Sequence, residues 1–440
     1  MKAFVGIDLG STTTKAVFLD ESGQVLGRGI TNSRSSYDLA AKIARDEARV
    51  SARFALLERS LKADEGLAAE AERLRSELIA HFHRHQQLVQ LGRLREIAFV
   101  EAHAPRVAAI AEPLRERLAV ILDAMEAEEK RPRLGILAKQ TSEFFRDRAA
   151  SAFSRLAEER ADSTVKFGDL MGIFDKAILQ VENTSFELKF DDSLREAAAE
   201  LVPAMGAEQG QRLIRVVETS LDIDLDEVRT IGTGYGRQRL PFAKEDIRSE
   251  ILCHGLGAHA QFPGTRTVLD IGGQDTKAIQ VDENGIVTSF QMNDRCAAGC
   301  GRYLGYIADE MSLGVHELGP IAQQSTRHVH IASTCTVFAG AELRDRLTAG
   351  QRREDILAGL HRAVILRAVA LLARSGGVEE QFTFTGGVAN NPAAVDALQE
   401  LVHENYGART LNISPGSIYT GALGAALFAL RAGEERWEAA

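Results

Sequence analysis

Three of the four cysteines lie in short segments of small residues, a setting that suits metal ligation. Cys296 and Cys300 are four residues apart in Asn-Asp-Arg-Cys-Ala-Ala-Gly-Cys-Gly, and Cys335 follows in Ser-Thr-Cys-Thr-Val-Phe. The sequence has no Cys-x-x-Cys pair, so the spacing fits neither a zinc ribbon nor a ferredoxin. Two or three exposed thiols would supply half of a metal cluster, which a second chain would complete. Cys253 differs, because it lies in a predicted helix over residues 244–259 and is interpreted as a buried core residue.

Two near-identical turns predict a phosphate site. Asp8–Lys15 and Asp270–Lys277 each follow an apolar strand and consist of Asp, a glycine turn, and Thr-Lys at the start of a second strand. Backbone N–H groups at such corners bind phosphate oxygens. The hydroxyls of Ser11, Thr12, Thr13 and Thr276 add donors, and Lys15 adds a positive charge. The predicted nucleotide ligands are Gly10, Ser11, Thr12, Thr13, Thr14 and Lys15 in the first turn and Gly272, Gly273 and Gln274 in the second.

Asp8 and Asp270 are the predicted catalytic residues. At the ends of their strands they would hold Mg²⁺ through water molecules or orient an attacking water. Neither turn is a Walker A motif, because Gly-x-x-x-x-Gly-Lys-Ser/Thr is absent from the sequence. One such turn alone is most often a plain hairpin, but the same residue order twice in one chain favours a duplicated nucleotide site.

A third glycine turn follows another predicted strand, in Thr-Gly-Gly-Val-Ala-Asn. Gly386 and Gly387 have no Cβ, so a flat ring can approach the backbone there. With Asn390 they are the predicted contacts of the adenine and ribose, although a lone Gly-Gly turn is weak on its own.

The segments of this chain are of two kinds, strand-rich and helix-rich. Strand patterns at both phosphate turns indicate hairpins, whereas residues 38–165 are dense in Ala, Leu, Glu and Arg at helical spacing. The duplicated hairpins indicate two homologous halves separated by a mainly helical block. Further expected elements are a strand at 185–190 and helices at 192–220, 302–312, 341–349, 353–374 and 420–432.

The composition sets broad limits on function. The chain has 440 residues, 45% hydrophobic and 26% charged, with a net charge of −10. An acidic chain argues against nucleic acid and anionic membranes as partners. The start of the chain has no signal-peptide pattern and no run of about 18 apolar residues occurs. We therefore expect a cytoplasmic protein whose cysteines are thiols or metal ligands.

Six motifs, taken together and in order, resemble the ATPases that activate 2-hydroxyacyl-CoA dehydratases and ATP-dependent benzoyl-CoA reductases. The resemblance covers roughly residues 1–33 and 225–432. The motifs are Gly6–Lys15, Gly232–Arg237, Asp270–Asp275, Met292–Gly299, Ser333–Ala339 and Thr385–Asn390.

The resemblance implies an α/β protein with the duplicated actin-like, sugar-kinase and chaperone ATPase fold, built from two ribonuclease-H-like halves. It implies ATP, Mg²⁺ and a [4Fe–4S] cluster between two subunits, with Cys296 and Cys335 as this chain's two ligands. The implied activity is ATP hydrolysis coupled to low-potential electron transfer to catalytic subunits. The implied partners are a homologous shorter ATPase subunit, two catalytic iron–sulfur subunits, and reduced ferredoxin as electron donor.

The chain departs from the short activators of this family in three places. Cys300 stands where they have Thr, so it is either a third ligand or a spectator thiol. Gly340-Ala341-Glu342 stands where they have Glu-Ser-Glu. The short activators also lack the helical block. The resulting expected division is 1–33 with 215–265 as the first ATPase half, 34–214 as the helical insertion, and 266–440 as the second half.

The helical block favours the larger ATPase subunit of a benzoyl-CoA reductase, an oxidoreductase of anaerobic aromatic degradation, as the main functional hypothesis. An activator of a 2-hydroxyacyl-CoA dehydratase is the alternative. A small-molecule kinase of the same fold is more remote, because no sugar-specific loop or substrate base stands out. A non-catalytic regulator that uses the helical block as a partner arm is the fourth hypothesis.

Overall fold

The protein is described by a computed structural model that covers residues 1–33, 36–131, 145–182, 190–234, 242–294, 300–311, 313–327, 329–331 and 336–438. The chain forms two compact units, one made of Met1–Ala52 with Asp224–Ala440 and the other of Arg53–Ile223. The first unit contains both sheets and all of the predicted site motifs. The second contains only helices in its described part.

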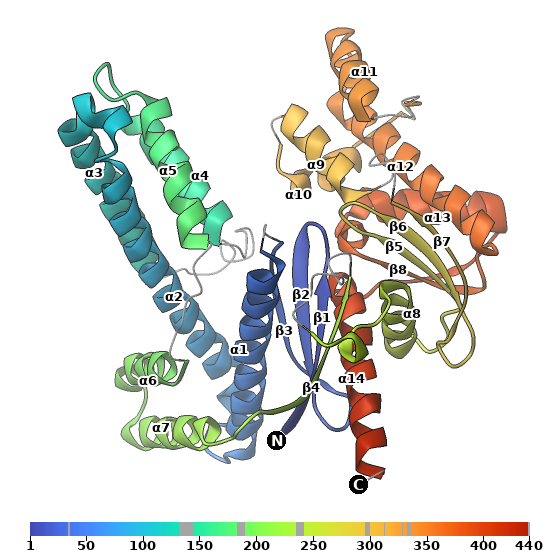
Figure 1. Ribbon diagram of the computed structural model, residues 1–440, viewed down its shortest axis with the longest axis horizontal. Helices are drawn as coiled ribbons and strands as arrows, with labels where there is room; N and C mark the ends of the chain where they lie inside the picture. Colours follow the sequence, from blue (N-terminus) through green and yellow to red (C-terminus); the bar gives the residue numbers. More distant parts are fainter. Residues whose placement is uncertain are drawn as a thin grey trace. The chain divides into compact units, whose positions relative to one another are not determined.

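The first unit holds two sheets of the same plan (Figure 1). In each, an antiparallel meander of three strands is extended by a parallel strand beside its first member, with the orders β3-β2-β1-β4 and β7-β6-β5-β8-β9. The strands of the first sheet are β1 (Lys2–Leu9), β2 (Thr13–Leu19), β3 (Val25–Asn32) and β4 (Asp226–Gly234). Those of the second are β5 (Thr267–Ile271), β6 (Thr276–Val281), β7 (Val287–Asn293), β8 (Gln381–Thr385) and β9 (Thr410–Asn412).

This duplication confirms the predicted α/β class and the two-halved actin-like fold. The inner strands are buried along nearly their whole length, as expected for strands covered on both faces. The remaining helices of this unit are α8 (Glu250–Gln261), α9 (Gly301–Glu310), α10 (Val315–Ala322), α11 (Thr336–Thr348), α12 (Arg353–Ser375), α13 (Pro392–Tyr406) and α14 (Thr420–Glu438).

Small residues bring α8 and α14 together in the first unit. Helix α14 packs on β1 and β4 of the first sheet, and α8 packs on β5, β6 and β7 of the second. The two helices also pack on each other, and at Gly424 of α14 a Cβ would overlap the carbonyl oxygen of Cys253 in α8. Close backbone approach of this kind fixes the helix crossing, because no larger side chain fits.

The second sheet is covered by α12, the one described helix long and apolar enough to be a membrane-span candidate. Its apolar stretch is 61% buried inside the fold. It packs against β6, β7, α10 and α13 in the largest hydrophobic cluster of this unit, as a core helix does.

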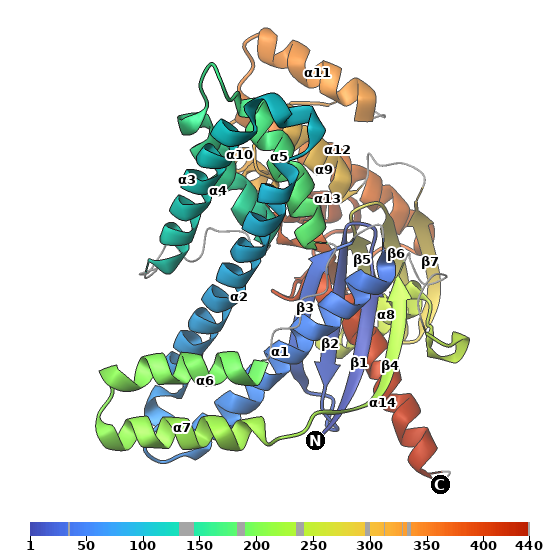
Figure 2. The same ribbon diagram turned by 60° about the vertical axis from the view of Figure 1, so that its left-hand side comes forward.

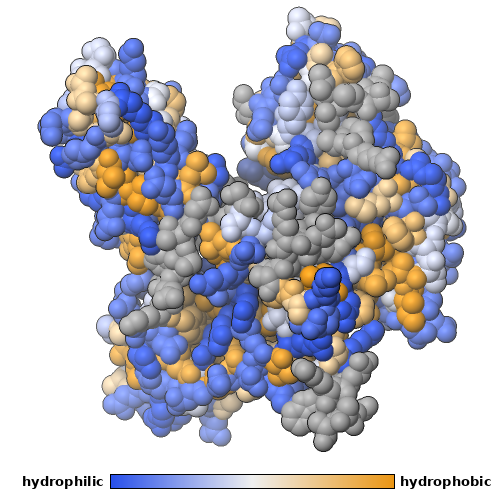
Figure 3. Space-filling model, in the orientation of Figure 1, coloured by the Kyte–Doolittle hydropathy of each residue, from blue (hydrophilic) through white to orange (hydrophobic). Residues whose placement is uncertain are grey.

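The second unit is a set of packed helices, with α6 and α7 side by side and α2 against α3 and α5 (Figure 2). Its core contains the stacked rings of Phe153 and Phe174, whose centroids are 4.6 Å apart. On the face visible in Figure 3, the surface over these helices is mainly hydrophilic, as expected for charged side chains exposed to solvent. The helices are α2 (Ala71–Glu101), α3 (Ala111–Lys130), α4 (Phe145–Arg160), α5 (Phe167–Glu182), α6 (Phe190–Leu201) and α7 (Ala207–Leu221), and α1 (Tyr37–Ala63) runs from the first unit into the second.

Two element predictions were wrong in detail. The helix expected from residue 244 begins at Glu250, because Ile247 bridges to Gly232 of β4 and Arg248 N–H donates to the Gly232 carbonyl. Phe190, expected to end a strand, begins α6, and residues 183–189 lie outside the described part. Helices α10 and α13 and strand β9 were not predicted. The expected division at residues 34, 215 and 266 stays a prediction.

Candidate nucleotide site

The two predicted catalytic aspartates occupy equivalent positions in the two sheets. Asp8 of β1 pairs in register with Lys15 of β2, and Asp270 of β5 pairs with Lys277 of β6. In both pairs the lysine Nζ lies 3.2 Å from the aspartate Oδ2. All four residues are at least 91% buried. The duplicated sequence therefore places two buried carboxylate–ammonium pairs in equivalent positions.

A threonine and a glycine on the neighbouring parallel strand complete each aspartate site. Asp8 is in register with Thr233, and Asp270 with Thr385, whose Oγ1 donates to Asp270 Oδ1 at 2.9 Å. Each threonine precedes a glycine, at positions 234 and 386, with φ values of +100° and +86°. Side chains at those glycines would come within 2.6 and 3.0 Å of the aspartate Oδ1 atoms. Glycine is needed for both the backbone conformation and the space.

Sequence reasoning found the duplicated Asp-Gly turns but missed this duplicated Thr-Gly. The signal was present, because Ile231-Gly232-Thr233-Gly234 and Phe384-Thr385-Gly386-Gly387 both end apolar strands. Gly386, predicted to contact adenosine, thus lies directly beside Asp270.

The second aspartate belongs to a larger buried charge cluster. Lys277 Nζ also lies 2.8 Å from Asp275 Oδ1 and 3.9 Å from Glu250 Oε2 of α8. Burial opposes ionisation of Asp270, but His254, Lys277 and the Thr385 hydroxyl outweigh it and lower the pKa of Asp270 to about 2. Burial likewise opposes the charge of Lys277, but its three carboxylate neighbours raise its pKa. Burial raises the pKa of Glu250.

The first phosphate turn divides into supporting and open residues. Thr14 is fully buried and its Oγ1 lies 2.9 Å from Ser33 Oγ, which in turn donates to the Gly10 carbonyl at 2.6 Å. Thr14 therefore supports the turn from inside. Ser11, Thr12 and Thr13 are at least partly exposed, so their hydroxyls remain open to a ligand.

The second phosphate turn faces the first. Gly272, Gly273 and Gln274 are half-buried, and the Gly272 N–H donates to the Asp275 carbonyl at 3.0 Å. The Thr12 hydroxyl lies against Gly273, where the missing side chain leaves room for it. The structure thus brings the two predicted phosphate turns together.

The third glycine turn is held by a neighbouring turn. Gly387–Asn390 form one turn of 3₁₀ helix, and Ser417 is hydrogen-bonded to this segment through its backbone and its hydroxyl. The Gly386 N–H donates to the Ser417 carbonyl at 3.2 Å, and Ser417 Oγ donates to Asn390 Oδ1 at 3.3 Å. The Asn390 side chain is therefore oriented by the turn that leads into α14.

The chemistry of the site fits a magnesium nucleotide. Four carboxylates, those of Asp8, Asp270, Asp275 and Glu250, surround two lysines, so the buried cluster favours additional positive charge. Within the described residues no three His, Cys, Asp or Glu side chains converge on one point. Mg²⁺ binds through one or two carboxylates, water and substrate phosphates, and the buried aspartates are carboxylates of this kind.

The cysteines separate into two classes. Cys296 and Cys335, the predicted cluster ligands, lie outside the described residues. Cys253 and Cys300 are both fully buried. Burial raises the pKa of Cys253 to about 12, as expected for a core thiol. Cys300 is buried at the start of α9, and its role as a third ligand or a spectator thiol stays a prediction.

The helix after the first cysteine segment is attached to the second phosphate turn. The Gly301 and Arg302 N–H groups, in the first turn of α9, donate to the Gly272 and Gly273 carbonyls, both at 2.8 Å. Four residues separate Gly301 from Cys296 in the sequence. The start of α9 is therefore hydrogen-bonded to the second phosphate turn.

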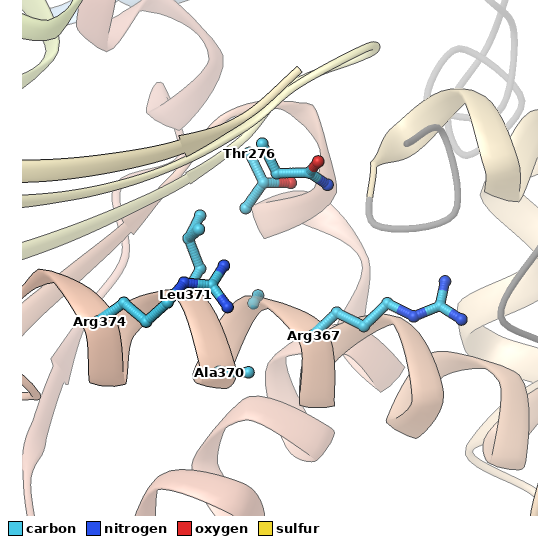
Figure 4. A pocket seen from close by; sticks show the side chains of 7 residues that line it. Thr276, Arg367, Ala370, Leu371 and Arg374 are labelled. Atoms are coloured by element: carbon cyan, nitrogen blue, oxygen red, sulfur yellow. The ribbon is translucent and has the colours of Figure 1, made fainter. Parts of the chain in front are cut away.

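One cavity of about 260 Å³ lies on the other face of the second sheet (Figure 4). It is lined by Thr276 of β6, Asn293 of β7 and, from α12, Arg367, Leu371 and Arg374 among others. Successive strand residues point to opposite faces, so Lys277 faces Asp270 while Thr276 faces this cavity. The prediction that the Thr276 hydroxyl donates to phosphate was therefore wrong. The cavity is separate from the aspartate site.

Comparison with known proteins gives a consistent result. The sequence profile of the BadF/BadG/BcrA/BcrD ATPase family matches residues 5–429. The (R)-2-hydroxyglutaryl-CoA dehydratase activating ATPase of Acidaminococcus fermentans is 45% identical over 206 residues, 47% of this chain and 76% of that protein. A benzoyl-CoA reductase subunit of Thauera aromatica is 32% identical over 205 residues, 47% of this chain and 71% of the reductase polypeptide. The solved structure of component A of the A. fermentans dehydratase covers 99% of this chain and 100% of its own at 22% identity, with a TM-score of 0.53 that shows a shared fold.

Proposed function

Because that profile spans residues 5–429, the chain belongs to the BadF/BadG/BcrA/BcrD ATPase family, and from this premise we propose that it is the ATP-driven electron-transfer activator of a 2-hydroxyacyl-CoA dehydratase. The sequence had favoured a benzoyl-CoA reductase subunit. The comparisons support the dehydratase alternative better, since identity to the activating ATPase is 45% against 32% for the T. aromatica reductase polypeptide.

The observation that carries the proposal is the attachment of α9 to the second phosphate turn. Two backbone hydrogen bonds, from Gly301 and Arg302, join the helix after Cys296 to Gly272 and Gly273. Hydrolysis that alters the phosphate contacts of this turn therefore also alters the start of α9.

In this proposal the two phosphate turns and the two aspartates perform the hydrolysis. Ser11, Thr12 and Thr13 donate to phosphate oxygens, and Asp8 or Asp270 orients the attacking water. Lys277 favours the ionised form of Asp270, since its ammonium lies 3.2 Å from a carboxylate oxygen, and the Lys15 ammonium lies at the same distance from Asp8. Water adds to the γ-phosphorus and the bond to the β-phosphate oxygen breaks, giving ADP and inorganic phosphate.

Cys296 and Cys335 are the residues that would hold a [4Fe–4S] cluster together with a second subunit. When bound, such a cluster supplies one-electron transfer at low potential. For a dehydratase activator the second subunit is another copy of this chain, the electron donor is a reduced ferredoxin, and the acceptor is the catalytic dehydratase. We place this assembly in the cytoplasm.

A benzoyl-CoA reductase ATPase subunit remains the second candidate. It is favoured by the helical unit Arg53–Ile223, the kind of insertion that is expected of the larger ATPase subunit and that short activators lack. In that case the second subunit is the shorter homologous ATPase, and the acceptor is a pair of iron–sulfur subunits that reduce the aromatic ring.

Anaerobic purification and reconstitution test the proposal. We expect a brown protein whose colour is lost in Cys296→Ala and in Cys335→Ala but kept in Cys253→Ala, the matched buried-thiol control. With ATP and a reductant it should activate dehydration of a 2-hydroxyacyl-CoA by a dehydratase partner. Activation of benzoyl-CoA reduction instead would favour the second candidate. A colourless monomer with unchanged ATPase activity in both variants would contradict both candidates.

A further inference from the structure

A buried histidine lies between the two aspartates and was not anticipated from the sequence. His254 of α8 is 6% exposed, and its Nδ1 lies 3.4 Å from Asp270 Oδ1. Among the described residues this Nδ1 has no hydrogen-bond partner at normal distance. A buried polar atom without a partner is costly, so its retention calls for a functional explanation.

The other side of the same ring faces the first half of the site. Beside Gly421, at the start of α14, the point where a Cβ would stand is 2.8 Å from His254 Nε2 and 3.1 Å from Asp8 Oδ2. The absence of a side chain at Gly421 leaves the ring and the Asp8 carboxylate adjoining a shared space. His254 therefore has Nδ1 next to Asp270, while Nε2 and the Asp8 carboxylate border the same space at Gly421.

The other described ion pairs and side-chain hydrogen bonds of the two carboxylates come from the same sheet as the carboxylate itself. Lys15 reaches Asp8 from within the first sheet, whereas Lys277 and Thr385 reach Asp270 from within the second. His254 lies on α8, the helix that follows β4 of the first sheet and precedes β5 of the second. Its side chain is thus placed to respond to both halves.

A core histidine with a purely structural role looks different in this protein. His361 of α12 is 1% exposed, and its ring nitrogens lie 2.7 Å from the Leu357 carbonyl and 2.9 Å from Asn391 Nδ2. Both of its nitrogens have partners. The Nδ1 of His254 is instead aimed at Asp270, a few tenths of an ångström beyond hydrogen-bonding distance.

We propose that His254 is a positioning residue for ATP hydrolysis, which lies against Asp270 through Nδ1 and borders the space beside Asp8 through Nε2, so that both carboxylates keep their productive positions. The inference rests on the proposed ATPase activity. An imidazole that carries a proton on Nδ1 can donate to Asp270.

Two substitutions of His254 test this inference in the full-length, anaerobically purified protein. The Asn side chain places an amide near the position of Nδ1, whereas Ala removes both ring nitrogens. His254→Asn should retain kcat for ATP hydrolysis within about 5-fold, whereas His254→Ala should lose about 100-fold, as misplacement of catalytic groups by an ångström can cause. KM for ATP should stay within about 3-fold in both, because ground-state binding is preserved.

The control is His259→Gln on the same helix. His259 Nε2 lies 3.0 Å from the Glu283 carbonyl, away from the two aspartates, so this variant should behave like the wild type. Urea midpoints check folding, and His254→Asn supplies the comparison if His254→Ala does not fold. Equal kcat in His254→Ala and the wild type, or equal losses in the Asn and Ala variants, would overturn the inference while the proposed ATPase stands. A wild type that does not hydrolyse ATP would overturn both.

Discussion

At the scale of single residues, the site depends on buried charges that compensate one another. Lys277 is the centre of this balance, because its ammonium is within 4 Å of the carboxylates of Asp270, Asp275 and Glu250 and only 3% exposed. Lys15 faces Asp8 alone among the ion pairs of the described chain. The two lysines are equivalent in sequence but differ in how much negative charge they neutralise.

Replacement of Lys277 by Met should therefore destabilise the fold more than replacement of Lys15 by Met. Breaking a buried ion pair costs about 3–5 kcal/mol, and here three carboxylates lose their cation. Urea unfolding at neutral pH measures the difference. Equal losses of unfolding free energy in the two variants would show that the clusters are energetically equivalent.

The buried thiol of Cys253 gives a pH-dependent prediction. Its pKa rises from 9.0 to about 12 on folding, so the protonated thiol favours the folded state and its contribution to stability is lost as the pH rises from 9 through 12. At pH 8 the folded chain should have roughly 1,000-fold less Cys253 thiolate than the unfolded chain. Mass-spectrometric mapping of iodoacetamide labelling should find Cys253 protected in the native protein and labelled in urea. Rapid native labelling would contradict its burial.

At the scale of elements, the site is set by strand register and by close helix packing. The sequence was sufficient to predict both hairpins, because Asp, glycine turn and Thr-Lys recur in the same order at Asp8 and Asp270. It did not reveal Glu250 and His254, since one helix residue near a site cannot be recognised without knowing how α8 packs. Thr14 and Gly272 were predicted to bind phosphate, but the Thr14 hydroxyl and the Gly272 N–H bond to their own chain. Whether a turn residue faces a ligand or its own chain depends on such hydrogen bonds, which the sequence does not reveal.

The α8–α14 crossing gives a direct test at this scale. A methyl group at Gly424 would overlap the Cys253 backbone, so Gly424→Ala should cost about 1–3 kcal/mol from overpacking. The matched control is Gly305 of α9, a helical glycine with nothing within 4 Å of its Cβ position. Gly305→Ala should stabilise the protein by about 0.5–1 kcal/mol. Thermal and urea unfolding of both variants would show opposite signs, and two stabilising results would contradict the close packing.

At the scale of the whole molecule, the helical unit is connected through two neighbouring chain segments. Arg53 donates from Nη1 to the Leu221 and Ile223 carbonyls, at 3.1 and 2.9 Å. On the other side of the boundary, Arg45 and Arg49 both pair with Glu227. The chain therefore leaves and rejoins the first unit at nearly the same place.

A shortened chain in which a Gly-Ser linker joins Ala52 to Asp224 should keep the nucleotide unit folded. Each unit has its own hydrophobic core, and linkers between close ends cost little entropy. Circular dichroism and the thermal shift caused by a non-hydrolysable ATP analogue should match those of the full chain. A soluble shortened chain that no longer binds the analogue would show that the helical unit takes part in nucleotide binding.

The claim that the duplicated aspartate turns form an ATPase site is tested most directly by ATP hydrolysis in Asp270→Asn beside the wild type. Asn keeps the shape and the hydrogen bond from Thr385 but removes the charge that orients water and metal. We predict steady ATP hydrolysis by the wild type and a loss of at least about 100-fold in Asp270→Asn. Binding of a non-hydrolysable analogue should stay within about 10-fold. Hydrolysis at the wild-type rate by a folded Asp270→Asn variant would contradict the account.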